Sequence, residues 1–127
     1  RAVRRGLHAG VYQDISTWQG LVSLTAAKAR EESGLTFSEV PLKLCLHFRM
    51  PRVSVLPKRF ERPHLKKPDL TNLIKSTEDG LVPSLIANDS LVVRIEASKR
   101  YALAGESPGC LIEISEVEPC QATTVVL

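Results

Sequence analysis

The sequence has few of the residues that build disulfide-bonded, metal-cluster or membrane-spanning proteins. Its three cysteines, Cys45, Cys110 and Cys120, are an odd number without a CxxC pair. This spacing argues against a zinc site or a disulfide framework and favours a reducing compartment. No apolar run approaches the ~18–20 residues of a transmembrane helix, so we expect no membrane contact and a cytoplasmic location. A glycine-rich phosphate loop and a serine-hydrolase motif are also absent, and we expect no small-molecule substrate.

What is present describes an ordinary globular chain. The sequence has 127 residues, of which 43% are hydrophobic, and its net charge is +3. This length suits one domain, and we predict a single domain over residues 1–127.

The charge is unevenly distributed along the chain. Between residues 52 and 75 only two acids, Glu61 and Asp69, accompany a run of cations: Arg52, Lys58, Arg59, Arg62, Lys66, Lys67 and Lys75. A basic segment on a nearly neutral domain indicates a surface for a polyanion, and a plain solvated loop is the alternative.

Hydrophobic periodicity predicts two helices and three strands. Helical spacing runs from Trp18 to a stop at Gly34, and residues 42–50 alternate as a half-buried strand. A short helix follows Pro68 to about Leu81, and strands are expected in "LVVRIEASKRYA" and "GCLIEISEV". The fold class is therefore α+β, a small mixed β-sheet with two main helices packed on it.

The segment "PRVSVLPKRFERPHLKKP" is rich in proline and predicts an irregular, mobile loop. Phe60 and His64 alternate with its cations. Rings beside cations suit a nucleic-acid backbone with an unstacked base, and they also suit an exposed loop.

Two aspartates flank the short helix. Asp69 stands at its N-terminus, where an N-cap is the ordinary role, and Asp89 stands in a turn, where a turn residue is the ordinary role. If the fold brings the two carboxylates together, their repulsion is relieved by a divalent cation, and hard oxygen ligands favour Mg²⁺ or Mn²⁺. A metal beside a basic loop and a lysine suits phosphodiester hydrolysis.

The stretch "KKPDLTNLIKSTEDGL…IANDSLVVRIEASKRY" resembles the RusA family of Holliday-junction resolvases. The family signature is KPDxDNLxKxxxDAL, then NDDSQV or similar, then a strand ending in K-x-Y. The dense match runs from Lys67 to Tyr101. The resemblance implies a RusA-like fold and a homodimeric, Mg²⁺-dependent endonuclease that nicks four-way junctions symmetrically. It also implies branched DNA as the partner, in a bacterial cell or a phage-infected host.

The family's residues carry over by position. Asp69 and Asp89 match two motif aspartates, Lys75 matches the lysine needed for catalysis, and Asp79 matches the aspartate at the helix end. With this resemblance, the basic segment is expected to hold DNA through Lys58, Arg59, Arg62, Lys66 and Lys67.

The chain departs from the family at Thr71, where a second motif carboxylate is usual. Glu78 lies two helical turns further on the same face, and our hypothesis is that it restores the carboxylate, directly or through water. The competing interpretation is a catalytically impaired protein that still binds branched DNA, and the third is a protein-interaction domain. The family's first strand is expected to be missing upstream of residue 1.

Overall fold

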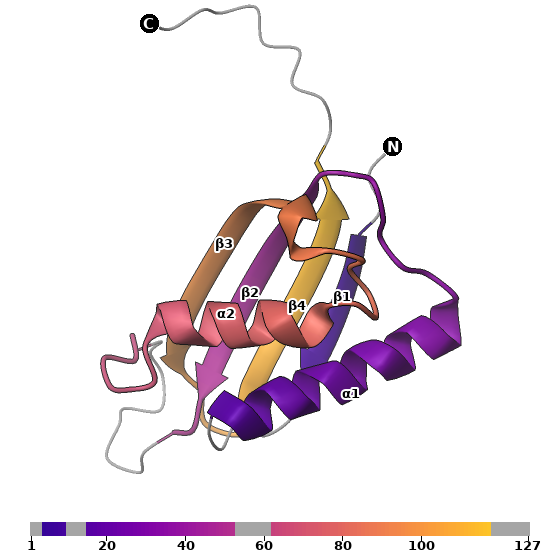
Figure 1. The fold of residues 1–127 in the computed structure, drawn as a ribbon. Helices are drawn as coiled ribbons and strands as arrows, with labels where there is room; N and C mark the ends of the chain where they lie inside the picture. Colours follow the sequence, from indigo (N-terminus) through magenta and orange to yellow (C-terminus); the bar gives the residue numbers. More distant parts are fainter. Residues whose placement is uncertain (1–3, 10–14, 53–61, 118–127) are drawn as a thin grey trace, which may run out of the picture.

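The computed structural model describes residues 4–9, 15–52 and 62–117, which form one sheet with two helices on one side of it (Figure 1). In chain order the elements are β1 (Arg4–Ala9), α1 (Ile15–Ser33), β2 (Leu42–Met50), α2 (Leu70–Leu81), the 3₁₀ turn η1 (Asp89–Leu91), β3 (Val92–Tyr101) and β4 (Gly109–Glu116). This arrangement confirms the predicted α+β class.

The sheet is mixed and has the strand order β1-β4-β2-β3. β4 pairs antiparallel with both β1 and β2, whereas β2 and β3 run parallel. A parallel pair needs a crossover connection, and α2 lies in that connection. The crossover is what brings α2 across the sheet near β3.

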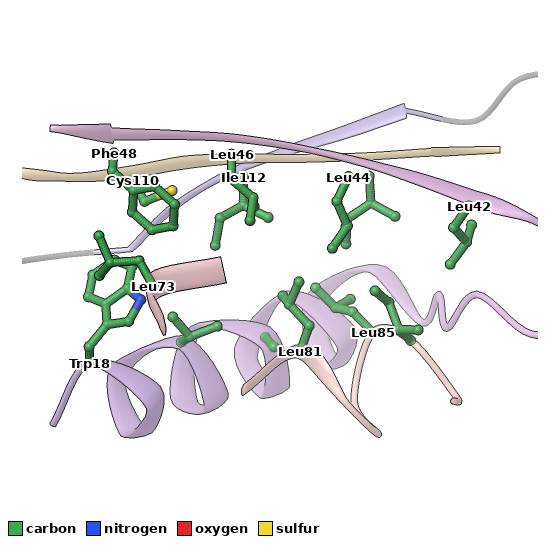
Figure 2. Close-up of a cluster of buried hydrophobic side chains, with 14 of the residues drawn as sticks. Trp18, Leu42, Leu44, Leu46, Phe48, Leu73, Leu81, Leu85, Cys110 and Ile112 are labelled. Carbon is green, nitrogen blue, oxygen red and sulfur yellow. The ribbon is translucent and has the colours of Figure 1, made fainter. Parts of the chain in front are cut away.

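Alternation along β2 divides the sheet into two faces. The strand spans Leu42–Met50 as predicted, and its five apolar alternate positions, Leu42, Leu44, Leu46, Phe48 and Met50, are buried. They meet Leu73 and Leu81 of α2 and Trp18 of α1 in one core, which Figure 2 shows between the strands and the helices. Residues on the intervening positions of β2 therefore point to the face that the helices leave uncovered, here called the open face.

The two helices make close contact around Thr77 and Gly80. The Trp18 indole Nε1 donates a buried hydrogen bond of 2.9 Å to Thr77 Oγ1, which in turn donates to the Leu73 carbonyl at 2.7 Å. A Cβ on Gly80 would stand 2.8 Å from the Val22 side chain, so α1 reaches the α2 backbone there. These contacts fix the position of α2 on the sheet.

One strand was not predicted. The expected element order began with a helix, but β1 precedes α1 and pairs with β4 from Arg4↔Ser115 to Ala9↔Cys110. Its sequence, RRGLHA, contains no β-branched or aromatic residue, so pairing with β4 rather than strand propensity defines it. The expectation of a family strand before residue 1 stays a prediction.

Other expectations agree with the described residues. Gly34 follows the last residue of α1 with a φ of 69°, a conformation that favours glycine. Cys45 and Cys110 are free thiols, and Cys120 lies outside the described residues. In the described part of the chain no helix combines the length and the apolar character needed to cross a bilayer.

Candidate functional site

Asp69 stands at the N-cap of α2, but its side chain does not cap the helix. Its backbone is extended, with φ −66° and ψ 145°, and no side-chain capping hydrogen bond is made. Only its main-chain carbonyl takes part, accepting from Leu73 N at 3.1 Å. An Asp at this position usually accepts from the first helical N–H groups. The exposed carboxylate of Asp69 is therefore left for another role.

Asp89 presents the same situation at the next turn. It is the first residue of η1, and the N-cap is the preceding Asn88, whose side-chain Oδ1 accepts from Ser90 N at 3.0 Å. The hydrogen bond expected of an ordinary turn aspartate is thus made by Asn88. The Asp89 side chain is exposed.

Glu78 is a partly buried carboxylate whose charge interacts with that of Asp89. Its pKa is raised above the ordinary value, first by partial burial and then by the nearby negative charges of Asp89 and Asp79, while Lys75 opposes the rise. Figure 1 shows η1 after the connection that leaves the C-terminal end of α2. Carboxylates that repel each other in this way provide a site whose repulsion a divalent cation relieves.

The residues of α2 divide between two sides of the helix. At about 100° per residue, Thr71 and Glu78 lie on one side of the helix, Asp79 lies on the side toward Gln19 of α1, and Lys75 lies between. Lys75 Nζ is 3.7 Å from Asp79 Oδ2, but the lysine side chain is 79% exposed. Such an exposed pair is weak, so Lys75 remains available to a phosphate.

A polar groove of about 200 Å³ runs between the helices beside Lys75, lined by Gln19, Asn72, Lys75, Ser76 and Asp79. Sequence reasoning did not find Gln19. It comes from α1, and only the packing of the two helices places it next to the residues of the α2 motif.

The structure does not gather all the predicted ligands at one point. Glu78 follows Asp69 by nine residues, a rise of about 13 Å along the helix axis. Among residues 4–9, 15–52 and 62–117, no group of three His, Cys, Asp or Glu side chains is arranged to hold a metal ion. Mg²⁺ is commonly held by one or two carboxylates together with water and substrate phosphates. The pair Glu78 and Asp89 fits that donor set, and the meeting of Asp69 with Asp89 stays a prediction.

The end of the basic segment, residues 62–68, is attached to the edge strand β3. His64 N donates to the Lys99 carbonyl at 3.3 Å and Tyr101 N donates to the Arg62 carbonyl at 2.9 Å. Lys99 Nζ donates to the carbonyls of Lys66 at 2.7 Å and Pro68 at 2.9 Å. Residues 62–68 form no helix or strand, as the prediction of an irregular loop expected, but these hydrogen bonds attach them to β3. Their mobility stays a prediction.

His64 does not serve as a stacking platform. Its ring is buried and lies edge-on to Tyr101, with 4.8 Å between centroids. Burial lowers the pKa of His64, and the charges of Lys99 and Lys66 lower it further. The expectation that this ring faces an unstacked base is corrected by its burial, whereas Phe60 lies outside the described residues.

Three of the five predicted DNA-binding cations are described. Arg62, Lys66 and Lys67 are exposed, whereas Lys58 and Arg59 lie outside the described residues. Lys99, which the sequence showed only as part of the K-x-Y ending of a strand, is the residue that attaches this segment. Figure 1 shows the start of α2 beside the C-terminal end of β3. Exposed cations thus lead directly to the carboxylate of Asp69.

The site combines an exposed, uncapped carboxylate at the start of α2, further carboxylates, an exposed lysine and a basic approach. This combination suits a class of protein that acts on a phosphodiester polyanion. The family model of endodeoxyribonuclease RusA matches residues 1–115, and the chain belongs to this family. No curated protein matches the chain. The resemblance drawn from residues 67–101 is confirmed.

Family membership establishes the reaction in outline. The protein is an endodeoxyribonuclease, a hydrolase of DNA phosphodiester bonds, of a family that acts on branched DNA as Holliday-junction resolvases. Members of this family generally depend on a divalent metal.

Proposed function

We propose that this protein resolves four-way DNA junctions by paired symmetric nicks, with Mg²⁺ or Mn²⁺, as a homodimer in the cytoplasm of a bacterial cell or a phage-infected host. One observation carries the proposal. Both aspartates that match the family motif stand at capping or turn positions, yet the Asp69 side chain makes no capping hydrogen bond and Asn88 makes the turn hydrogen bond in place of Asp89. Their carboxylates are exposed and available to a cation.

Each residue has a role that its position supports. Asp69 and Asp89 are the proposed ligands, with Glu78 and Asp79 assisting, since Glu78 is coupled to both later aspartates. When bound, the divalent ion supplies Lewis acidity and makes a bound water more acidic.

Lys75 is proposed to offset negative charge at the scissile phosphate. Its ammonium is mostly exposed and only loosely paired with Asp79, so little has to be broken when a phosphate arrives. Arg62, Lys66 and Lys67, together with Lys58 and Arg59, are proposed to hold the DNA backbone. A four-way junction is two-fold symmetric in outline, so a two-fold dimer places one such site on each of two opposed strands.

Thr71 favours a second candidate, a branched-DNA-binding protein with impaired catalysis. Threonine supplies no charge at the motif's second carboxylate position, and it is exposed beside the other site residues. Glu78 lies on the same side of α2, about 10 Å further along the axis. Its compensation for Thr71, directly or through water, remains part of the proposal.

The test is cleavage of an end-labelled synthetic four-way junction in Mg²⁺ by the full chain and its variants. We expect paired symmetric nicks, reduced more than about a hundredfold in Asp69→Asn and reduced in Glu78→Gln. Glu32→Gln, which changes an exposed carboxylate of α1, is the matched control and is expected to cleave normally.

Two results would decide against the first candidate. Binding of the junction without nicks, with nicking gained in Thr71→Asp, would show that the threonine has switched the enzyme off. Full activity in Asp69→Asn would show that the proposed ligand set is wrong.

A further inference from the structure

The open face of the sheet carries a cleft at the end where β2 and β3 finish and β4 begins. It has a volume of about 660 Å³ and is lined mainly by His47, Arg49, Arg62, Ser98, Arg100 and Glu106. Because Leu46 and Phe48 are buried on the helix side, His47 and Arg49 point to the open face. The cleft is thus separate from the exposed side of α2 that carries the proposed catalytic residues.

The cleft holds more positive than negative charge. Arg100 is occupied by Glu106 in a two-pronged ion pair, with N–O distances of 2.7 and 3.1 Å. Glu106 also accepts from Leu103 N at 2.9 Å, which fixes its orientation. This single carboxylate stands among three arginines that line the cleft. Arg49, Arg62 and Lys99 are the cations in excess, and the Lys99 ammonium already donates to the Lys66 and Pro68 carbonyls.

These two arginines are held in different ways. Arg49 donates its Nε to the Ser107 carbonyl at 3.0 Å, a bond that orients the guanidinium while its other nitrogens lie outside that contact. The Arg62 side chain is exposed, and its main chain is fixed by the bond from Tyr101 N. A guanidinium oriented by its backbone contacts suits a phosphate group, which it recognises through two parallel N–H donors.

His47 lines the cleft beside Ser98. Its Nε2 lies 3.7 Å from Glu113 Oε1, and its Nδ1 lies 3.4 Å from Ser98 Oγ. Glu113 is not among the residues that line the cleft.

The cleft is continuous with the approach to the proposed catalytic site. Arg62 lines the cleft and opens the segment that β3 holds in place. The same segment continues through Lys66 and Lys67 to Asp69. Cations therefore extend from the open face around the β3 edge to the start of α2.

We propose that this open-face cleft is a second DNA-binding surface, in which Arg49 and Arg62 hold backbone phosphates of a duplex arm that leads away from the cleavage point. The inference rests on the proposed function, because it assumes that the substrate of the α2 site is branched DNA. It adds the surface that holds one arm of that DNA. Charge complementarity favours a DNA backbone over a protein partner, and each phosphate contact contributes a salt-dependent term.

The experiment measures binding without cleavage. Fluorescence anisotropy with a labelled four-way junction is recorded in EDTA over a range of salt concentrations, for the full chain and for Arg49→Gln, Arg62→Gln and both together. The slope of log K against log salt is expected to fall by about 1 in each single variant and about 2 in the double variant. Arg30→Gln, an exposed arginine at the end of α1, is the matched control and is expected to keep the slope.

Circular dichroism accompanies each titration. If Arg49→Gln loses its fold because the Ser107 contact is removed, Ser98→Glu decides the question, since it places a negative charge at an exposed position of the cleft that has no role in the proposed function. Arg62→Gln alone does not decide it, because Arg62 also belongs to the basic segment that leads to Asp69. An unchanged slope and affinity in Arg62→Gln and in the folded Arg49→Gln would overturn the proposal. A changed sedimentation coefficient of an arginine variant, with an unchanged salt slope, would also overturn the proposal. That result would assign the cleft to contact with a second copy of the chain.

Failure of this inference is distinguishable from failure of the proposed function. Normal junction cleavage with slopes insensitive to Arg49 and Arg62 would overturn the cleft and leave the nuclease. Slopes that respond to both arginines, with no cleavage in Mg²⁺, would support the cleft and overturn the nuclease.

Discussion

The two faces of the sheet use the same strands for opposite purposes. On the covered face, Leu44 and Leu46 of β2 are buried against the helices. On the open face, Lys43 pairs with Glu96 at 3.2 Å and Arg49 enters the arginine-rich cleft. The difference shows how a period of two lets one strand supply both a hydrophobic core and a charged surface.

Polar groups follow the same division. The covered face holds a neutral, buried hydrogen bond from Trp18 to Thr77, which positions α2. The open face holds ion pairs that solvent and salt reach. Substitutions on the covered face should therefore alter the free energy of unfolding. Substitutions on the open face should alter how stability depends on pH and how DNA binding depends on salt.

The largest expected effect comes from the covered face. Thr77→Val keeps the side-chain shape but removes the hydroxyl that accepts from Trp18 Nε1 and donates to the Leu73 carbonyl. We expect the free energy of unfolding to fall by about 1–3 kcal/mol in urea denaturation. Thr77→Ser, which keeps the hydroxyl, is the control and should lose less. Equal stability of the valine variant and the parent would contradict this account of how α2 is held.

An intermediate effect is expected where the two faces meet at the β3 edge. Lys99→Met removes the ammonium that binds the carbonyls of Lys66 and Pro68. We expect the amides of His64 and Tyr101, which bond across this edge, to exchange hydrogen faster by about tenfold, since each such bond contributes about 1–1.5 kcal/mol. Junction cleavage should also fall, because the segment preceding Asp69 is released.

The control for Lys99 is Lys43→Met on β2, whose salt bridge to Glu96 lies elsewhere. It should leave the exchange of His64 and Tyr101 unchanged. Unaltered exchange in Lys99→Met would mean that the lysine does not hold the segment.

The smallest effect belongs to the open face. The pKa of Glu106 is lowered to about 2, chiefly by its hydrogen bonds with Arg100, so the pair stabilises the fold above the ordinary carboxyl pKa of 4.5. That contribution is lost as the pH falls from about 4.5 toward 2. Glu106→Gln should therefore be less stable by about 0.2–1 kcal/mol at pH 7, a range that allows for solvent screening.

The measurement is thermal unfolding of Glu106→Gln and the parent between pH 7 and pH 3, with Glu32→Gln as the control. The difference in melting temperature should narrow toward pH 3. A difference that is constant with pH would show that the ion pair is not its cause. In the same variant Arg100 loses its carboxylate, so DNA should bind several-fold more tightly if the cleft receives phosphates.

Local patterns predicted most of the elements and failed where pairing decides. The β2 strand was predicted at its observed bounds because its five alternate apolar residues can all be buried only if they lie on the same face of the sheet. The α2 helix was predicted by its apolar stripe and by Pro68 before it. β1 was missed because RRGLHA has little strand character, and its partner β4 lies about a hundred residues away in the sequence.

The site was predicted in its residue types more than in its arrangement. Asp69, Lys75, Asp79 and Asp89 were proposed from the motif, and Glu78 was proposed from its helical spacing to Thr71; their roles stay predictions. The motif did not show that Asn88 rather than Asp89 makes the turn hydrogen bond. It also did not show that the charges of Glu78 and Asp89 interact, because this depends on the position of η1 relative to α2. Lys99 and Gln19 were missed because their contacts join distant parts of the chain.

The sequence by itself determined the family, the α+β class, the covered face of β2 and the charges near Asp69. Each of these follows from residue types and their spacing within a short segment of the chain. Only the tertiary structure decided that residues 62–68 follow β3, that His64 is buried against Tyr101, and that Arg49 and Arg62 share one cleft. These features join residues that are far apart along the chain. Their contacts depend on strand pairing and helix packing, which local sequence patterns do not specify.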